Sequence, residues 1–555
     1  MAERPVHENG PGVITMMQAQ ANAARRRVAG LVATLLSVGC LVVVAGAQAA
    51  PPADLDGYAE RALETFGAPG MAVTIVERGR PSVVRTYGVQ RLGEPTKVDE
   101  HTLFSIGSTT KAFTSALLAM LVDEKKLTWD TKVSDVLPGF KMYDPYASSE
   151  MTVLDLLVHR SGLGPGAGDL LFYPPTTFSR AEILHRLRYI KPATSFRSAY
   201  AYDNLLYIVA GLVVEAVEKA SWEDVVRRRV FDPLQMKRTS PVSSIPNAVN
   251  RAWPHGRFSS EVRGTGPLTP LPGHLALDVA APAGAINSSA SEIARWLELL
   301  LGQGLDPRTG TRLYSEAVAR EMWLPHTVVP IYAAPPLLAT ARPNFRAYAL
   351  GWNTSDYRGR RIVSHGGGLP GFATMFVIVP DRDIAFAIFT NSEENGMLSS
   401  MQYRLLDHYL DLKSPDWIDA VSKTQAERIA KAQVQLAKVK EQSANEQGAA
   451  KGPSLPLAQY AGRYRDAWYG TATIESSADS LSMRFDHTPT MASKLEHVRF
   501  DTFRTRWTDR VIEDAYVTFA LKSDGSVDRM AMRAVSPLAD FSFDYQDLLF
   551  VPDPQ

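Results

Sequence analysis

The chain has 555 residues, and its 59 Lys and Arg residues balance its 59 Asp and Glu residues. Hydrophobic residues make up 45% and charged residues 21%, which is the usage of a soluble globular protein. The length predicts two or three domains. Nucleic-acid binding is not expected, because no long basic run follows Arg27.

The N-terminus has the parts of a targeting segment. Three arginines at 25–27 precede an uncharged, largely apolar stretch over 28–50 that ends in Ala47-Gln48-Ala49. This pattern predicts a signal peptide over 1–49 and an exported protein, periplasmic or secreted. The alternative is a membrane anchor over 28–50, which is nearly long enough to span a bilayer. Membrane contact is expected only through this segment, and only if it is retained.

The sequence indicates neither a thiol-dependent site nor a metal site. Its single cysteine, Cys40, lies inside the targeting segment, so the mature protein is expected to have none. The histidines at 101, 255, 487 and 497 lack metal-ligand spacing. We therefore expect no cofactor and no metal.

Residues 53–412 alternate between strand-like and helix-like segments. Residues 71–76 and 82–87 read as paired strands, and 112–127 as a mostly buried helix. Residues 376–379 and 384–389 look like a hairpin of central strands. Strands at both ends with helices between them predict an α/β sheet with a helical insert.

The rest of the chain divides into a connector and a tail. Residues 413–455 hold a charged, solvated helix followed by the linker Gly452-Pro453-Ser454. Residues 456–555 alternate polar and apolar side chains, and Asp524-Gly525 is a hairpin turn signal. We expect a small all-β, barrel-like domain that folds as its own unit, so that the preceding domain keeps a reactive nucleophile without it.

Three short motifs stand at element boundaries: Ser108-Thr109-Thr110-Lys111, Tyr202-Asp203-Asn204 and His365-Gly366-Gly367-Gly368. On a helix, residues i and i+3 share one face, so Lys111 lies beside Ser108. Ser108 is the only serine with a lysine three residues on. A serine in the first helical turn lies where unpaired N–H groups favour negative charge.

In these motifs the chain resembles the serine β-lactamase, penicillin-binding and esterase family, in particular its class C-like branch, with Ser-x-x-Lys, Tyr-x-Asn and His-x-Gly. The segments Val158-His159-Arg160-Ser161-Gly162-Leu163 and Pro282-Ala283-Gly284 also match, although Arg160 replaces a threonine. The resemblance covers 53–412 and implies an antiparallel sheet flanked by helices, with a helical insert. The tail is similar to a lipocalin-like domain of some of these hydrolases.

The resemblance implies acyl transfer through Ser108, with Lys111 and Tyr202 as catalytic partners. For Lys111 to be a base, its pKa must fall from about 10.4 to roughly 7–8, and that of Tyr202 must fall by a similar amount from about 10. These shifts do not distinguish the two candidates. Asn204, His365, Gly367 and Gly368 would bind substrate, with the N–H groups of Ser108 and Gly368 as oxyanion hole. His159 is expected to be structural.

The predicted function is therefore an exported serine hydrolase acting on peptides, D-amino-acid amides or esters, with cell-wall peptides among the candidate substrates. His365 stands where β-lactamases and carboxypeptidases of the family carry a lysine, which favours esterase or aminopeptidase-like work. Two alternatives remain open: a β-lactamase, and a penicillin-binding or sensing protein that acylates without efficient turnover.

Overall fold

The computed structural model describes residues 50–245, 250–258, 260–447 and 452–553. The expected signal peptide or anchor and Cys40 lie outside these residues. Among the helices that are described, none has both the length and the apolar character needed to cross a bilayer.

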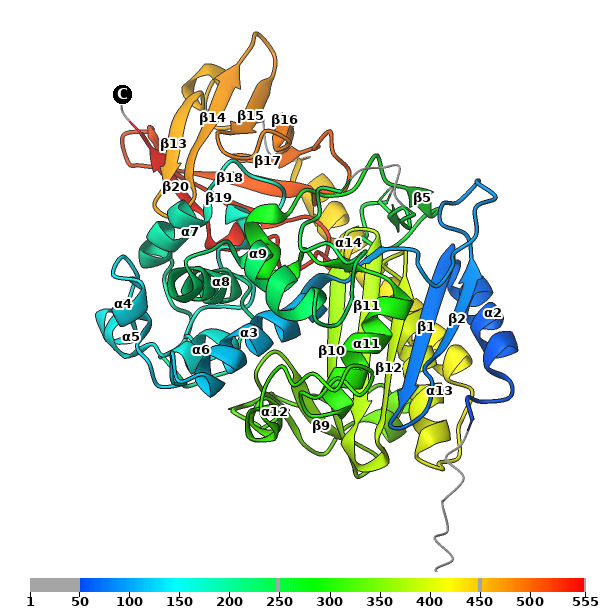
Figure 1. Cartoon of the computed structure of the whole chain (residues 1–555). Coiled ribbons are helices and arrows are strands. Elements are labelled where there is room, and N and C mark those ends of the chain that lie inside the picture. The colour runs from blue at the N-terminus through cyan, green and yellow to red at the C-terminus, as the bar shows by residue number, and fades with distance from the viewer. Residues whose placement is uncertain (1–49, 246–249, 259, 448–451, 554–555) are drawn as a thin grey trace, which may run out of the picture. The chain divides into compact units, whose positions relative to one another are not determined.

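An eight-stranded antiparallel sheet forms the centre of the larger domain (Figure 1). Its strands, in order across the sheet, are β2 (Val83–Gly88), β1 (Gly70–Glu77), β12 (Ile384–Thr390), β11 (Phe372–Val379), β10 (Arg360–Leu369), β9 (Asn353–Tyr357), β8 (Arg346–Tyr348) and β7 (Thr327–Val328). The two predicted strand pairs are present, and the hairpin of β11 and β12 lies in the interior of the sheet. The predicted antiparallel sheet is thus confirmed.

Helices cover both faces of this sheet. Along β1, Met71, Val73 and Ile75 pack against α2 (Leu55–Phe66) and α13 (Asn395–Tyr409). Ala72 and Val76 point the other way, toward α3 (Lys111–Asp123) and α11 (Ala290–Leu301). Because both faces are buried, the central strands are continuously apolar rather than alternating.

The predicted helical insert lies on the α3 side of the sheet (Figure 1). Its principal helix is α8 (Leu205–Glu218), which is apolar nearly all round and mostly buried. Contacts of α8 with α3 and with α10 (Ala281–Gly284) connect the insert to the rest of the domain. The helix that carries Lys111 is therefore enclosed on several sides.

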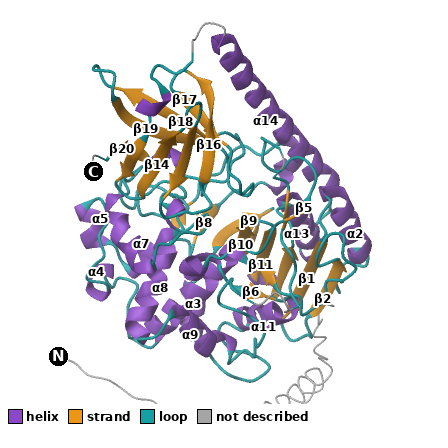
Figure 2. Ribbon diagram, turned by 90° about the horizontal axis from the view of Figure 1, so that it is seen from above, coloured by secondary structure: helices purple, strands orange, loops and turns teal. Residues whose placement is uncertain are grey.

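A long helix, α14 (Trp417–Gln447), runs from the α2 and α13 side of the sheet toward a closed eight-stranded barrel (Figure 2). The barrel strands are β13 (Gly462–Asp466), β14 (Gly470–Ser476), β15 (Leu481–Phe485), β16 (Ala492–Arg499), β17 (Thr502–Thr505), β18 (Ala515–Leu521), β19 (Val527–Ala534) and β20 (Leu549–Pro552). The turn Asp524-Gly525 joins β18 to β19, as predicted, and Gly525 has the left-handed φ of 84°. The barrel-like domain is confirmed.

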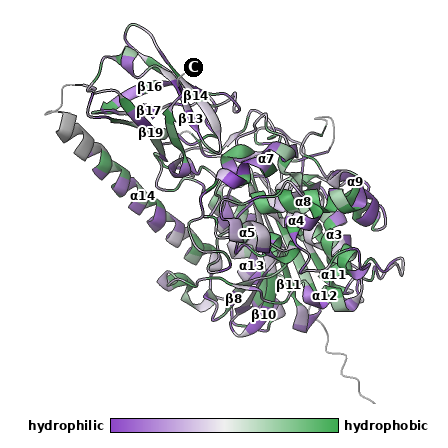
Figure 3. Ribbon diagram, turned by 90° about the vertical axis from the view of Figure 1, so that its left-hand side faces the viewer, coloured by the Kyte–Doolittle hydropathy of each residue, from purple (hydrophilic) through white to green (hydrophobic). Residues whose placement is uncertain are grey.

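The connector helix is less solvated than its composition predicts. Much of α14 mixes polar and apolar residues around an exposed surface (Figure 3). Trp417 at its start is fully buried, however, and Ala432 and Leu436 pack against Tyr516 and Val535 of the barrel and Val262. One face of α14 therefore packs on both domains.

Candidate active site

Ser108 stands in the first turn of a helix, as its motif predicts. A 3₁₀ turn over Gly107–Thr110 leads directly into α3, and Ser108 lies on the wall of a cavity of about 700 Å³. Gly107 has φ +51°, a backbone conformation that favours glycine. The turn thus presents the Ser108 hydroxyl to the cavity, while α3 behind it is buried from Lys111 to Leu121.

Lys111 is completely buried one turn behind Ser108. Its Nζ donates to Ser108 Oγ at 3.1 Å, to Asn204 Oδ1 at 2.7 Å and to the Ala283 carbonyl at 3.0 Å. Burial lowers the pKa of Lys111 to about 7, against the opposing effect of the carboxylates of Asp169 and Asp203. An uncharged amine beside the serine is therefore well populated at neutral pH.

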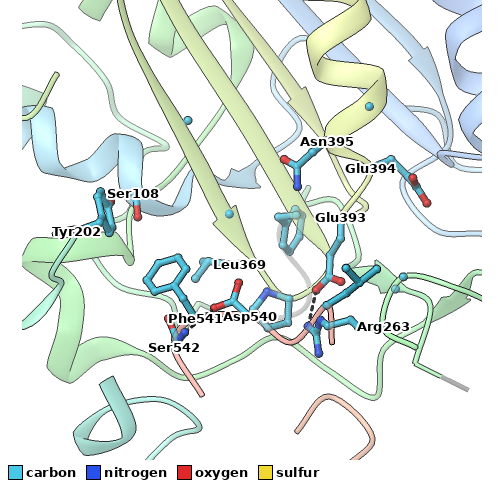
Figure 4. Close-up of a pocket in the computed structure, with 18 of the residues that line it drawn as sticks. Ser108, Tyr202, Arg263, Leu369, Glu393, Glu394, Asn395, Asp540, Phe541 and Ser542 are labelled. Atoms are coloured by element: carbon cyan, nitrogen blue, oxygen red, sulfur yellow. Dashed lines mark hydrogen bonds and ion pairs between the residues drawn. The ribbon is translucent and has the colours of Figure 1, made fainter. Parts of the chain in front are cut away.

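The second motif lies in the loop before α8. Burial raises the pKa of Tyr202 well above its usual 10. Its hydroxyl faces Ser108 (Figure 4), but the buried oxygen forms no hydrogen bond of acceptable geometry. Asp203 caps α8 by accepting from the Leu205 N–H at 2.8 Å, and burial raises the pKa of Asp203 to about 7. Burial therefore moves the pKa values of Lys111 and Tyr202 in opposite directions, and the lysine is the group that can be a base at neutral pH.

The glycines of the third motif allow β10 to approach the Ser108 turn closely. A Cβ on Gly367 would lie 2.0 Å from the Ile106 carbonyl oxygen and 3.3 Å from the Ser108 nitrogen. A Cβ on Gly107 would lie 2.8 Å from the Gly368 nitrogen. Ser108 and Gly368 thus lie on two closely packed segments, and both line the cavity, so their backbone N–H groups are candidates for an oxyanion hole.

His365 borders the cavity but is nearly buried, with 3% of its surface exposed. Tyr348 donates to His365 Nε2 at 2.8 Å, and His365 Nδ1 donates to the Gly366 carbonyl at 2.7 Å. Burial, helped by the nearby Lys111, lowers the pKa of His365 to about 3. The imidazole is therefore neutral, and both of its nitrogens already have partners within the protein.

His159 packs behind Tyr202, with ring centroids 4.3 Å apart. Its Nδ1 accepts from the Asp203 N–H at 3.1 Å, and burial lowers its pKa well below 6.5. His159 has the left-handed φ of 55°. These contacts support the loop that carries Tyr202 and Asn204, in line with the structural role expected from the sequence.

Several groups at this site could not be identified from motifs. Asp169 accepts from Asn204 Nδ2 at 2.8 Å, and its pKa is raised well above the usual range by burial. Ser542, from the barrel domain, donates to the same carboxylate at 2.7 Å. Nothing local marks these residues, because they come together only in the fold. The segment that holds Ala283 matches the family pattern, but no residue type marks a backbone carbonyl as a partner of Lys111.

The cavity extends well beyond the motifs. Its walls also include residues of α14 and of the barrel domain, among them Gln425, Arg428, Asp540 and Phe541. Arg263 also lines the cavity and pairs with Glu393 at 3.1 Å (Figure 4). It pairs with Glu513 of the barrel domain at 3.1 Å as well. In the described part of the chain, no three His, Cys, Asp or Glu side chains are grouped so as to hold a metal ion.

Comparisons with known proteins identify the family of the larger domain. The family model described as "Beta-lactamase" matches residues 55–410, and a "Domain of unknown function (DUF3471)" model matches residues 446–552. "Unguisins hydrolase ungD'" of Aspergillus campestris (strain IBT 28561) is 30% identical over 442 residues, or 76% of this chain and 77% of that protein. "Unguisins hydrolase ungD" of Aspergillus violaceofuscus (strain CBS 115571) is 28% identical over 81% of this chain and 82% of that protein.

A solved structure shares the fold. The chain is similar to the octameric penicillin-binding protein homologue from Pyrococcus abyssi, with a TM-score of 0.53 and 17% identity over 90% of this chain and 99% of that one. At this identity the likeness concerns the fold alone.

Proposed function

The chain belongs to the beta-lactamase family of serine hydrolases, and from this premise we propose that it cleaves amide bonds of peptides through an acyl-enzyme on Ser108. The observation that carries the proposal is the 3.1 Å contact between Ser108 Oγ and the buried Lys111 amine, whose pKa is about 7. A serine hydroxyl becomes an effective nucleophile when such a base takes its proton.

The acylation step uses Lys111 and Tyr202 in different roles. Lys111 accepts the Ser108 proton as Oγ bonds to the substrate carbonyl carbon, and the N–H groups of Ser108 and Gly368 stabilise the oxyanion. When the tetrahedral intermediate collapses, the carbon–nitrogen bond breaks and the leaving amine takes a proton. Tyr202, a neutral phenol with a free O–H beside Ser108, supplies that proton and is restored through Lys111. Water then hydrolyses the ester by the same groups.

The size of the cavity supports a peptide-sized substrate, and the names of two relatives support hydrolysis. A volume of about 700 Å³ is within the range of sites that enclose a ligand of several residues' size. Two relatives that cover most of the chain carry the name hydrolase. We also propose that the enzyme is exported, which is supported by the arginines at 25–27 and the apolar stretch after them.

Time-resolved intact-mass analysis with an activated nitrophenyl ester tests the proposal. The wild type should gain one acyl group on Ser108 and then return to its original mass as the ester hydrolyses. Ser108→Ala should remain folded and unmodified. Equal ester turnover by the wild type and Ser108→Ala would contradict the mechanism, and an adduct that never decays would instead favour a protein that acylates without turnover.

A further inference from the structure

The barrel domain supplies part of the active-site wall. Between β19 and β20 the chain leaves the barrel, and Leu538, Asp540, Phe541 and Ser542 line the cavity that holds Ser108. The Phe541 ring meets the Tyr202 ring edge-on, with centroids 5.8 Å apart (Figure 4). This segment therefore touches the catalytic tyrosine directly.

A chain of hydrogen bonds runs from this segment to the nucleophile. Ser542 Oγ donates to Asp169 Oδ2 at 2.7 Å, and Asn204 Nδ2 donates to the same oxygen at 2.8 Å. Asn204 Oδ1 in turn accepts from Lys111 Nζ, which contacts Ser108. Four hydrogen bonds thus connect a serine of the barrel to the catalytic serine.

A second barrel residue fixes the backbone around Asp169. Asp544 accepts from the N–H groups of Gly168 at 2.6 Å and Leu170 at 3.3 Å, the two neighbours of Asp169. Asp169 and Asp544 are both fully buried. Buried carboxyl groups are costly unless they are hydrogen-bonded, so both depend on these partners.

The orientation of the Asn204 amide depends on Asp169. A side-chain amide has N–H donors at one end and an oxygen acceptor at the other. The Lys111 amine donates to Asn204, so it needs the oxygen end of the amide. With the Asp169 oxygen fixed behind the NH₂ group, the amide oxygen must face Lys111. If Asp169 shifts, nothing on that side holds this orientation.

We propose that Ser542 is a positioning residue for the hydrolase: its hydroxyl holds the Asp169 carboxylate so that the Asn204 amide presents its oxygen to Lys111. The barrel domain is therefore part of the catalytic apparatus. The inference rests on the proposed function, since it assigns Ser542 to the Ser108 and Lys111 site.

The pH profile gives this role a specific signature. The groups that face Lys111 are Ser108, Asp169, Tyr202, Asp203, Asn204, Tyr207 and the Ala283 carbonyl, together with the nearby neutral imidazoles of His365 and His159. Loss of the Ser542 donor further raises the pKa of Asp169 and weakens its negative charge. The pKa of Lys111 then falls, so the acidic limb of kcat/KM moves to lower pH while the plateau drops.

The test compares full-length Ser542→Ala, Ser542→Thr and Ser526→Ala on a neutral nitrophenyl ester, with Ser108→Ala as reference. Ser526 is an exposed serine of the barrel that donates to Asp524 in the hairpin turn, so it is a matched control. Ser542→Ala should lower the plateau of kcat/KM by roughly tenfold to a hundredfold. Ser542→Thr should restore most of it, and Ser526→Ala should match the wild type.

The variants distinguish a failure of the Ser542 proposal from a failure of the proposed function. If Ser108→Ala is inactive but folded Ser542→Ala keeps the wild-type plateau and pH profile, the role of Ser542 is wrong and the proposed function stands. If Ser108→Ala retains full activity, the proposed function itself is wrong. Should Ser542→Ala lose thermal stability, Ser542→Thr decides: a folded Thr variant as impaired as the Ala variant overturns the proposal.

Discussion

At the scale of single residues, Lys111 and Tyr202 share the same kind of buried surroundings, and their acid–base chemistry gives them opposite roles. Both are buried, and burial disfavours the charged form of each. For a lysine the disfavoured form is the ammonium, so its pKa falls to about 7; for a tyrosine it is the phenolate, so its pKa rises. The same desolvation makes Lys111 a base and keeps Tyr202 a proton donor.

Residue-level prediction from the sequence succeeds where the signal is local. The spacing of Ser108 and Lys111 is a property of one helical turn, and the structure places the two side chains 3.1 Å apart. His365 is different: its position next to the cavity follows from the motif, but its engagement with Tyr348 does not. The partner lies on β8, a three-residue strand too short to predict from alternation.

At the scale of elements, the long apolar strands and the barrel hairpin could be predicted, because β-branched runs favour strands and Asp-Gly favours a tight turn whatever the rest of the fold. The short strands β7, β8 and β9 could not, since pairing with their neighbours defines them. The buried face of α14 was also missed. Its few Ala and Leu residues stand among many charged ones, a composition typical of a solvated helix. Only the fold shows that Ala432 and Leu436 pack against the barrel.

The close approach of β10 to the Ser108 turn can be tested with one added methyl group. Gly367→Ala would place Cβ 2.0 Å from a backbone oxygen, so β10 and the turn must separate and the oxyanion donors diverge. We expect the rate of Ser108 acylation to fall by roughly a hundredfold. Gly366→Ala is the control, because its Cβ would meet its nearest neighbour at an ordinary 3.5 Å. Equal acylation rates for both folded variants would refute this role of Gly367.

At the scale of the whole molecule, the interior of the barrel is filled by side chains, and the barrel-domain residues that reach the active site lie outside it. Its interior holds aromatic rings in mutual contact, such as Tyr460, Phe503 and Phe519 with centroids 5.0–5.9 Å apart. The segment around Ser542 instead leaves the barrel to reach the hydrolase cavity. Contacts between residues more than 370 positions apart, such as Asp169 and Ser542, have no sequence signal, so the sequence alone predicts two independent domains.

Removal of the barrel should therefore impair the catalytic domain. A chain ending at Gly452 lacks Ser542 and Asp544, so Asp169 loses a hydrogen-bond donor, and the Ala432 and Leu436 face of α14 is exposed. We expect the rate of Ser108 labelling by a fluorophosphonate to fall at least tenfold and the melting temperature to decrease. A shortened chain that labels at the full-length rate with an unchanged melting temperature would show that the two domains are independent.

The central claim is that an uncharged Lys111 activates Ser108, and the pH dependence of the acylation rate tests it most directly. The rate of adduct formation on Ser108, followed by intact mass between pH 5 and pH 9, should fall as the pH drops through about 7, because protonation removes the base. Lys111→Arg, which stays charged throughout, should acylate roughly a thousandfold more slowly than the wild type above pH 7, and the gap should narrow at lower pH as Lys111 becomes protonated. A rate independent of pH across this range, with Lys111→Arg as fast as the wild type, would contradict the account.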